Sequence, residues 1–385
     1  MQSREKRGRE VSIDYLRAFV TLLVLAHHSS LAYTTFAHLD TANYLLSTAP
    51  IVDSQRWGFL DYAENFNDVF FMSLMFFISG LFVWPTLGKK AVSHFLRDRL
   101  LRLGLPFLVG AAFLMPVAYY PSWLVAGGQP GYFRYWLGFL RNGWSPGPLW
   151  FVWLLLLFDV IAAGVWLLFR KHDGRFAVRS APRAFLIIFV VSFFAYVPML
   201  ARFGFGTWVA FLFPPLYFQI ARIFLYLTWF FAGVLIGSGG IATGFLAEKS
   251  PFARHWPWWI AVCLLAYNLL WFVPGIIEHS HGSSQLRDLS YVTFWVFSCC
   301  ASCFGLLALF RGVFTRRRKW MDSIARAAYI MYIVHYVYVI WTQYLLLGLP
   351  ASAGVKFSIT CALAISVSWL SARLLLRVPV LKSLL

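Results

Sequence analysis

Charge is scarce in this sequence of 385 residues. Only 12% of the residues are Asp, Glu, Lys or Arg, and the acidic residues number 15. A soluble globular domain carries about twice that share of charge, so a soluble protein is excluded. The sequence also has no internal repeat, no low-complexity tract and no polar stretch long enough for a separate soluble domain. It is 60% hydrophobic with a mean hydropathy of +0.69, which indicates an integral membrane protein.

Cysteine is also rare, and its five residues all fall inside apolar runs. Cys300 and Cys303 have the C-x-x-C spacing found in metal sites, but neither a second pair nor a histidine ligand lies near them in the sequence. We therefore expect buried, inert thiols and no metal.

What the sequence does have is a large positive net charge, +18. Such a value could indicate a nucleic-acid-binding protein. The basic residues, however, are spread over short segments between apolar runs, which is how orientation in a membrane is encoded. No nucleic-acid partner is expected. The 18 Trp, 18 Tyr and 39 Phe agree with aromatic belts at the membrane surfaces and a packed interior.

Apolar runs of about 20 residues, the length that crosses a bilayer as a helix, recur ten times. The first is longer than the apolar core of a signal peptide, about 7–15 residues, so we expect it to be retained as a span. The predicted fold class is an all-α integral membrane protein of about ten transmembrane helices in a single domain, residues 1–385. The predicted spans are 12–34, 65–87, 103–121, 148–169, 184–201, 218–238, 257–274, 289–310, 327–347 and 355–376.

Basic residues between the predicted spans alternate along the chain. The segments on the side that includes both termini hold 25 Lys and Arg, whereas the segments on the other side hold 5. Basic residues favour the cytoplasmic side of a membrane. We therefore expect both termini in the cytoplasm, with tails at residues 1–11 and 377–385, and an even number of spans.

Four ionisable residues interrupt the first predicted span, VSIDYLRAFVTLLVLAHHSSLAY. Arg17 and His28 are eleven residues apart, which places them on one helix face about 16 Å apart along the axis, and Asp14 joins the same stripe. Asp14 and Arg17 could simply pair at the membrane interface. His28 lies deeper, where an ionisable group usually faces a cavity or a pathway. His27 points elsewhere and is interpreted as structural or interfacial.

The second predicted span carries Glu64 and Asp68 at its outer end. By helix rise, Asp68 lies at about the depth of His28, where a carboxylate could fix the tautomer of the imidazole and raise its basicity. The alternative is helix capping, since acidic residues favour helix N-termini. Capping explains Glu64 well and Asp68 less well, because Asp68 falls inside the span.

A basic stretch, FLRDRLLRLGLPF, leads into the third predicted span and contains Arg97, Arg99 and Arg102. These residues belong either to the ordinary cytoplasmic belt or to an anion site, since guanidinium groups bind phosphates well. A lone buried Asp or His is often only hydrogen-bonded structure, so the remaining candidates carry less weight. These weaker candidates are Asp159, Gln219, Arg222 and His335, of which Arg222 and His335 are kept as second-tier site residues.

Together these stretches resemble the membrane acyltransferase-3 family over essentially the whole chain. The resemblance rests on D-Y-L-R-A with a histidine eleven residues after Arg17, F-F-I-S-G at 76–80, the basic stretch that runs into L-G-L-P, P-L-W-F at 148–151, and Y-I-M-Y-I-V-H ending at His335. Members of this family acylate bacterial surface sugars, lipopolysaccharide, nodulation factors and periplasmic glucans. Among its branches, the sequence most resembles the glucan succinyltransferase type.

The resemblance implies an enzyme of the bacterial inner membrane that moves an acetyl or succinyl group from cytoplasmic acyl-CoA to a hydroxyl of an extracytoplasmic carbohydrate. It further implies that His28 is essential and that Arg17, Arg99 and Arg102 serve the donor, with Arg97 beside them. Acyl-CoA is then a substrate, and no permanently bound cofactor is expected.

Acyl transfer assigns these residues hypothetical roles. His28 would act as the base for the accepting hydroxyl or as a transient acyl carrier, with Asp68 orienting it. The acceptor would enter from outside near Trp57, Glu64 and Arg222. The alternatives are a transporter or flippase for a polar or lipid-linked sugar, although the sequence shows neither internal repeats nor broken helices, and a non-catalytic membrane sensor. The acyl group, the acceptor and homo-oligomerisation are left open.

Overall fold

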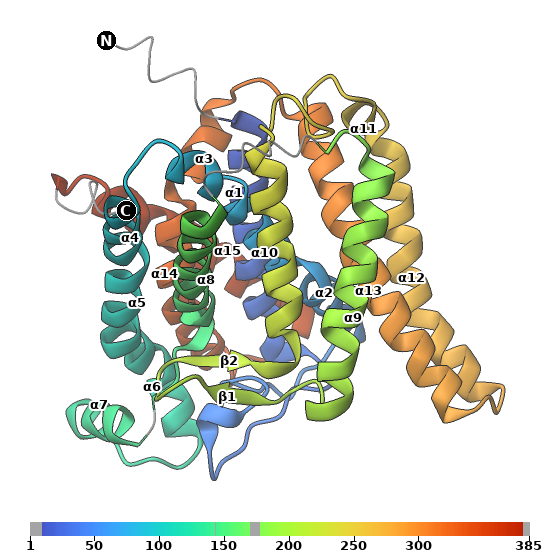
Figure 1. Ribbon diagram of the computed structural model, residues 1–385. Helices are drawn as coiled ribbons and strands as arrows, with labels where there is room; N and C mark the ends of the chain where they lie inside the picture. The colour runs from blue at the N-terminus through green and yellow to red at the C-terminus, as the bar shows by residue number, and fades with distance from the viewer. Residues whose placement is uncertain (1–9, 143, 170–177, 380–385) are drawn as a thin grey trace.

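The computed structural model describes residues 10–142, 144–169 and 178–379. Within these ranges the chain is almost wholly helical (Figure 1), so the predicted all-α membrane fold is confirmed. The predicted tails lie largely outside the described residues. So do several basic residues on which the predicted orientation depends: Arg4, Lys6, Arg7, Arg9, Arg170, Lys171, Arg175 and Lys382.

Long helices run between the two ends of the bundle (Figure 1). They are α1 (Val11–Ser30), α2 (Gly58–Gly80), α8 (Trp150–Phe169), α9 (Ala181–Phe203), α10 (Ile223–Ser238), α12 (Trp256–His279), α13 (Ser284–Val313), α14 (Lys319–Leu345) and α15 (Ala353–Leu375). Short helical elements connect or extend them: η2 (Leu31–Tyr33), η3 (Tyr44–Leu46), α3 (Val83–Leu87), α7 (Tyr132–Arg141), η6 (Gly147–Leu149), η7 (Ile220–Arg222) and α11 (Pro251–Arg254).

Nine helical segments in the described part of the chain are long and apolar enough to cross a membrane. Each overlaps one of the ten predicted spans. The remaining predicted span is α1, whose 20 residues include Asp14, Arg17 and two histidines and are therefore less apolar. α1 packs against α2, α13, α14 and α15. Because protein surrounds much of this helix, most of its length is shielded from lipid.

The third predicted span, 103–121, is the least accurate. The structure instead has one continuous helical segment, Val92–Val125, so the three arginines predicted to precede the span lie within the helix. Two π-helical turns interrupt the regular α-helix of this segment. Its parts are α4 (Val92–Arg99), η4 (Leu100–Gly104), α5 (Leu105–Val109), η5 (Gly110–Leu114) and α6 (Met115–Val125).

A small two-stranded sheet departs from the all-helical prediction. β1 (Trp208–Ala210) pairs antiparallel with β2 (Tyr217–Gln219), where the sequence predicted that the sixth span had already begun at residue 218. Pro214 and Pro215 lie in the connection between the strands and lack the amide hydrogens that a helix needs. The helix therefore starts only at η7. The sheet lies at the end of the bundle opposite the two termini (Figure 1).

The segment between α1 and α2 is held in place by two cations. Lys356 of α15 forms an ion pair with Asp53, with Nζ 2.6 Å from Oδ2 and both side chains buried. The Arg56 guanidinium donates to the carbonyls of Asp53, Thr34 and Ala37 at 2.7, 2.8 and 3.0 Å. Backbone groups that lack secondary-structure partners are thereby satisfied, and the segment is fixed over the end of the bundle.

α2 and α10 approach each other backbone to backbone. A Cβ added at Gly80 would collide with the carbonyl of Phe230, and one added at Gly233 would collide with that of Phe77. Gly233 and Gly237 form the G-x-x-x-G pattern that allows helices to pack closely in membranes. Glycine at these positions sets the distance between the two helices.

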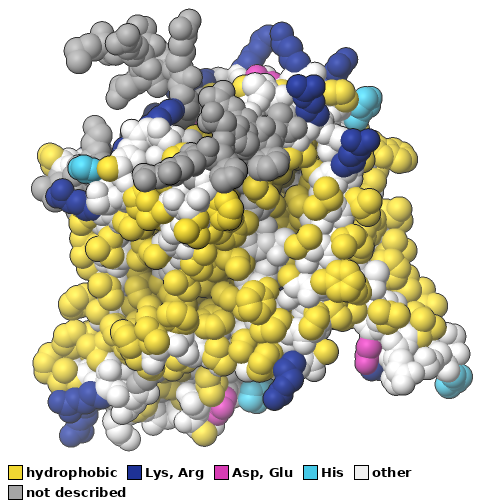
Figure 2. All heavy atoms as spheres, in the orientation of Figure 1, with side chains coloured by type: hydrophobic (Ala, Val, Ile, Leu, Met, Phe, Trp, Pro, Cys, Tyr) yellow, Lys and Arg dark blue, Asp and Glu magenta, His cyan; other side chains and the backbone are white. Residues whose placement is uncertain are grey.

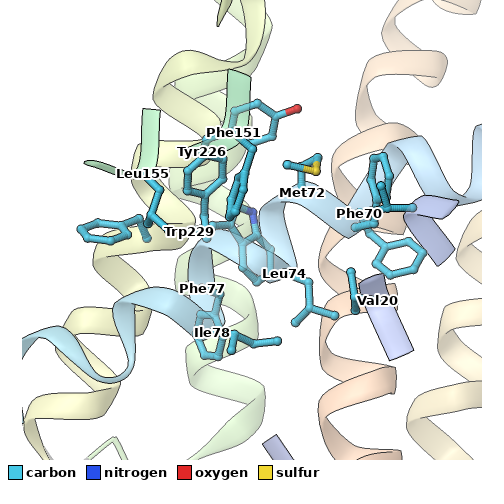
Figure 3. Close-up of a cluster of buried hydrophobic side chains, with 14 of the residues drawn as sticks. Val20, Phe70, Met72, Leu74, Phe77, Ile78, Phe151, Leu155, Tyr226 and Trp229 are labelled. Carbon is cyan, nitrogen blue, oxygen red and sulfur yellow. The ribbon is translucent and has the colours of Figure 1, made fainter. Parts of the chain in front are cut away.

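Large apolar side chains fill the space around this contact (Figure 3). Trp229 is fully buried against Phe77, with ring centroids 6.0 Å apart. The outer surface between the two ends of the bundle is also apolar, and Lys and Arg gather towards its edges (Figure 2). The labelled core residues are Val20, Phe70, Met72, Leu74, Phe77, Ile78, Phe151, Leu155, Tyr226 and Trp229.

Candidate active site

A cavity of about 740 Å³ lies among α1, α2, α4, η4, α8, α14 and α15, near the start of α1 and the end of α15. No acidic residue is among the described residues that line it. A surplus of guanidinium groups suits a ligand with several negative charges, phosphates above all. The arginines that line this arginine cavity are Arg17, Arg99, Arg102, Arg326, Arg373 and Arg377.

Three of the four arginines expected to serve the donor meet in this cavity. Arg17 comes from α1, Arg99 from α4 and Arg102 from η4. Arg97 does not line the cavity and lies exposed on α4. The structure therefore places Arg97 outside the cavity and the other three arginines at its wall. The donor-binding role of those three stays a prediction.

Sequence reasoning missed the contribution of α14 and α15 to the cavity. Arg326, Arg373 and Arg377 fall in segments that were used only to predict orientation. A signal was nevertheless present, because residues three apart are neighbours on a helix surface. Polar residues recur at this spacing along α14: Ser323, Arg326, Tyr329, Tyr332 and His335.

Two of the cavity arginines are positioned by carboxylates. Nε of Arg99 lies 3.3 Å from Oδ2 of Asp159, a buried residue of α8, and its guanidinium lies 5.1 Å from the ring centroid of Phe95. The Arg17 guanidinium lies 3.2 Å from Oδ1 of Asp14. Asp159, a weak candidate in the sequence, thus acts on the site through Arg99.

Aromatic contacts connect the cavity to the first-helix histidine. Tyr332 lines the cavity, and its ring centroid lies 5.8 Å from that of His335. The His335 ring is fully buried and lies 5.3 Å from the ring of His28. His28 keeps partial exposure. The structure therefore brings together two histidines that lie 307 positions apart in the sequence.

The neighbouring histidine has a different partner. Nε2 of His27 lies 3.6 Å from Oε1 of Glu64. The capping interpretation of Glu64 is wrong, because α2 already begins at Gly58 and its first-turn acidic residue is Asp61. Asp61 accepts hydrogen bonds from the amide and hydroxyl of Thr35. Glu64 instead lies within the helix beside an imidazole.

Comparison with known families identifies the class of protein to which the chain belongs. A family model of the acyltransferase-3 type, described as an acyltransferase domain, matches residues 10–373. The chain belongs to the membrane acyltransferase-3 family. The predicted family and enzyme class are therefore confirmed. Neither a curated protein nor a solved structure matches the chain.

In this acyltransferase, the carboxylate expected to orient His28 has another partner. Asp68 forms a two-pronged ion pair with Arg222, with oxygen–nitrogen distances of 2.9 and 2.5 Å. The two residues are 154 positions apart. The contact between Asp68 and His28 was predicted from the depths of residues on the first two spans, which do not include Arg222. The predicted contact between Asp68 and His28 is replaced by this ion pair.

Because Arg222 is paired with Asp68, its guanidinium is not available to bind a carboxylate of a substrate. Its side chain is buried against aromatic rings, with the guanidinium 4.5 Å from the ring centroid of Phe205 and 5.1 Å from that of Trp295. Stacking on rings and pairing with a carboxylate both satisfy a buried guanidinium. Gln219, the other residue noted at this position, is buried and its side-chain amide donates to the carbonyl of Phe205. Both residues therefore stabilise the fold of the acyltransferase.

On the far side of His28, aromatic rings continue towards the end of the bundle that carries the sheet. The ring of His28 lies 5.1 Å from Tyr336, which lies 5.7 Å from Tyr119. Tyr119 lies 6.5 Å from Tyr44, and Tyr44 lies 5.8 Å from Trp123. Burial raises the pKa of Tyr44 to about 12, so its phenol stays protonated and can donate a hydrogen bond at neutral pH. The acyltransferase thus has polar or aromatic groups on both sides of His28.

Proposed function

We propose that the protein transfers an acyl group, acetyl or succinyl, from acyl-CoA to a hydroxyl of a carbohydrate on the opposite side of a bacterial inner membrane. The observation that carries this proposal is the arginine cavity and its connection to His28 through Tyr332 and His335. Acyl-CoA enters as a substrate, with no permanently bound cofactor. The whole chain, residues 1–385, acts as one domain.

The donor would bind with its phosphates among the cavity arginines. Arg17 and His28 are separated by about 16 Å along α1, which suits the long, thin pantetheine arm of coenzyme A. Tyr332 and Phe151 line the same cavity and would flank this arm. Positive-inside logic places the cavity on the cytoplasmic side, together with both termini.

The acceptor would approach His28 from the other side. The aromatic side chains of Tyr336, Tyr119, Tyr44 and Trp123 form a continuous series of contacts in that direction. Aromatic faces pack against the apolar faces of sugar rings, while phenol hydroxyls donate hydrogen bonds. The acceptor site was predicted near Trp57, Glu64 and Arg222, and this series takes the place of Arg222, whose guanidinium is occupied by Asp68.

The reaction balances with one imidazole. His28 takes the proton of the acceptor hydroxyl as its oxygen attacks the thioester carbonyl. The carbon–sulfur bond then breaks, a carbon–oxygen ester bond forms, and the proton passes to the sulfur of coenzyme A. His28 returns to its neutral form and no charge is left in the membrane.

Acyl transfer by purified, lipid-reconstituted protein tests the proposal. Labelled acetyl-CoA and succinyl-CoA are supplied separately, and release of free coenzyme A and label on an added glucan are measured. We expect wild type to turn over at least one donor and His28→Ala to lose about 100-fold or more, the range of general base catalysis. His27→Gln is the matched control, because this neighbouring histidine faces Glu64, and it should retain most activity.

Two outcomes would overturn the assignment. If His28→Ala remained as active as wild type, His28 would not be the base. If wild type neither bound nor cleaved either thioester, the cavity would serve another anion, and transport of a polar or lipid-linked sugar would become the better explanation.

A further inference from the structure

Buried imidazole nitrogens without hydrogen-bond partners occur in two adjacent rings of α1 and α14. They are Nδ1 of His28 and Nε2 of His335, whose ring centroids lie 5.3 Å apart, and Nδ1 of the neighbouring His27 also lacks a partner in the described structure. A buried polar atom without a partner usually costs free energy and calls for an explanation. His335 is fully buried in the middle of α14, and the proposed reaction uses only His28, so the presence of a second histidine is unexplained.

The tautomer of His335 follows from its local contact. Its Nδ1 lies 2.6 Å from the carbonyl oxygen of Tyr332. A carbonyl oxygen only accepts hydrogen bonds, so Nδ1 carries the proton. The neutral ring then has its lone pair on Nε2. His335 is therefore held as an acceptor at the atom that has no partner.

His28 can supply the matching donor. In one tautomer its Nδ1 carries a proton, and that buried atom is the one without a partner. A nitrogen lies about 1 Å from the centroid of an imidazole ring and an N–H···N contact spans about 3 Å, so a bonded pair has centroids about 5 Å apart. The observed separation is 5.3 Å with the ring planes only 33° apart. A tilt of this size is compatible with an in-plane hydrogen bond between a nitrogen of each ring.

The other neighbours of His28 do not offer this geometry. His27 and Tyr336 both lie 5.1 Å away by ring centroid, but their rings are inclined at 86° and 74° to that of His28. Nitrogen lone pairs and N–H bonds lie in the ring plane, so perpendicular rings present an edge to a face. His335 is the neighbour whose orientation suits a nitrogen-to-nitrogen hydrogen bond.

We propose that His335 is the positioning residue of His28, accepting a hydrogen bond from Nδ1–H of His28 and so leaving Nε2 of His28 as the base. This inference rests on the proposed acyl transfer. His335 takes the place that the sequence assigned to Asp68. The two nitrogens are not bonded to each other in the described structure, and catalytic hydrogen bonds are commonly long until substrate binds and then tighten.

A neutral acceptor suits this position in a membrane. A carboxylate at the same depth would need a cation beside it, as Asp68 needs Arg222. An imidazole fixes the tautomer of His28 with no resting charge. When Nε2 of His28 takes up a proton during the reaction, the lone pair of His335, which accepts from Nδ1–H, stabilises the positive charge of the imidazolium.

Two substitutions separate positioning from a purely structural role. In His335→Asn the side-chain amide can still donate to the Tyr332 carbonyl, but nothing reaches the position of Nε2. In His335→Gln the amide oxygen reaches that position and can accept from His28, while the local bond to Tyr332 is lost. We expect kcat to fall about 100-fold in His335→Asn and less than about tenfold in His335→Gln. The donor KM should stay within about threefold of wild type in both.

A control on the same helix removes a polar contact elsewhere. Tyr338→Phe loses the bond between the Tyr338 hydroxyl and Ser371 of α15 without touching His28, and should keep wild-type kcat. Thermal unfolding of each variant shows whether the fold is intact. If His335→Asn were as active as wild type, or if His335→Gln were the more damaged of the two, the proposal would be wrong.

A spectroscopic measurement tests the hydrogen bond independently of turnover. In protein labelled with ¹⁵N-histidine and embedded in lipid, the His28 signals are identified by their loss in His28→Ala. We expect wild-type His28 to be protonated at Nδ1 and this preference to be lost in His335→Asn. An unchanged His28 tautomer in that variant would refute the role of His335, even if no thioester were turned over. Absence of turnover with an altered tautomer would instead count against the proposed function alone.

Discussion

Two of the regions where charged residues enter the helical bundle are organised differently. In the α2–α10 region, Asp68 and Arg222 neutralise each other in a two-pronged pair, and rings cover the guanidinium. In the arginine cavity, six arginines surround an open volume of about 740 Å³ and no acidic residue lines it among those described. In the described part of the chain, Asp14 pairs with Arg17 and Asp159 pairs with Arg99.

This difference separates structural charges from functional ones. A buried ion pair whose partners satisfy each other leaves nothing for a ligand. A group of like charges around a cavity keeps its electrostatic potential and its hydrogen-bond donors for an incoming anion. Changes in the first region should therefore alter stability, and changes in the second should alter the donor requirement.

Breaking the ion pair should have the largest effect. Arg222→Gln leaves Asp68 without its cation, and removing one member of a buried pair costs about 3–5 kcal/mol. We expect a large loss of folded protein, measured as the midpoint of thermal or denaturant unfolding in detergent. The double variant Asp68→Asn with Arg222→Gln removes both charges and should recover part of the stability. Equal stability of the single variant and wild type would show that the pair is not structural.

The helix contact beside the pair should be the next most sensitive. Gly233→Ala places a methyl group against the carbonyl of Phe77, and overpacking of this kind costs about 1–3 kcal/mol. Gly164→Ala on α8 is the matched control, because a Cβ there meets no neighbouring atom within 4 Å. Unfolding midpoints should fall for the first variant only. A fall of the same size in both would indicate a general effect of the substitution.

A cavity arginine should change binding rather than stability. Arg102→Ala removes a charged donor, and a hydrogen bond to a charged group is worth about 1.5–3 kcal/mol, which corresponds to about a 10- to 100-fold rise in the donor KM. Arg97→Ala removes the same charge from the same helical segment but outside the cavity, and should leave the donor KM within about twofold. Titrations with acyl-CoA check both. Equal effects would mean that general surface charge, not the cavity, binds the donor.

Much of the fold could be predicted because lipid imposes a simple rule on sequence. In the described part of the chain, nine predicted spans overlap with helices that are apolar enough to cross a membrane. Where the prediction was wrong, a local feature had overridden hydropathy. The helical segment Val92–Val125 begins well before its apolar part, because the Arg-rich residues at its start are also helical. The β1–β2 sheet forms where two prolines interrupt the helix.

The candidate site was only partly predictable. Spacing on one helix could place Arg17 and His28 on a common face, but it could not show which residues from other helices would meet them. Asp68 finds Arg222, and His28 finds His335, through packing of segments far apart in the sequence. Contacts of this kind follow from the tertiary arrangement, which hydropathy does not encode.

The two π-helical turns, η4 and η5, have a consequence for how related chains can diverge. Each π turn holds one residue more than an α-helical turn. A deletion of one residue at 100–104 would let the helix close into a regular turn, leaving Arg99 in place. Because a π turn and an α turn each complete one rotation, every side chain beyond it, Tyr119 included, would keep its orientation around the axis. The same deletion inside the regular helix of α5 would instead rotate those side chains by about 100°. The π turns are thus the places where this segment can change length while the arginine cavity and the aromatic side chains nearest the acceptor both stay in register.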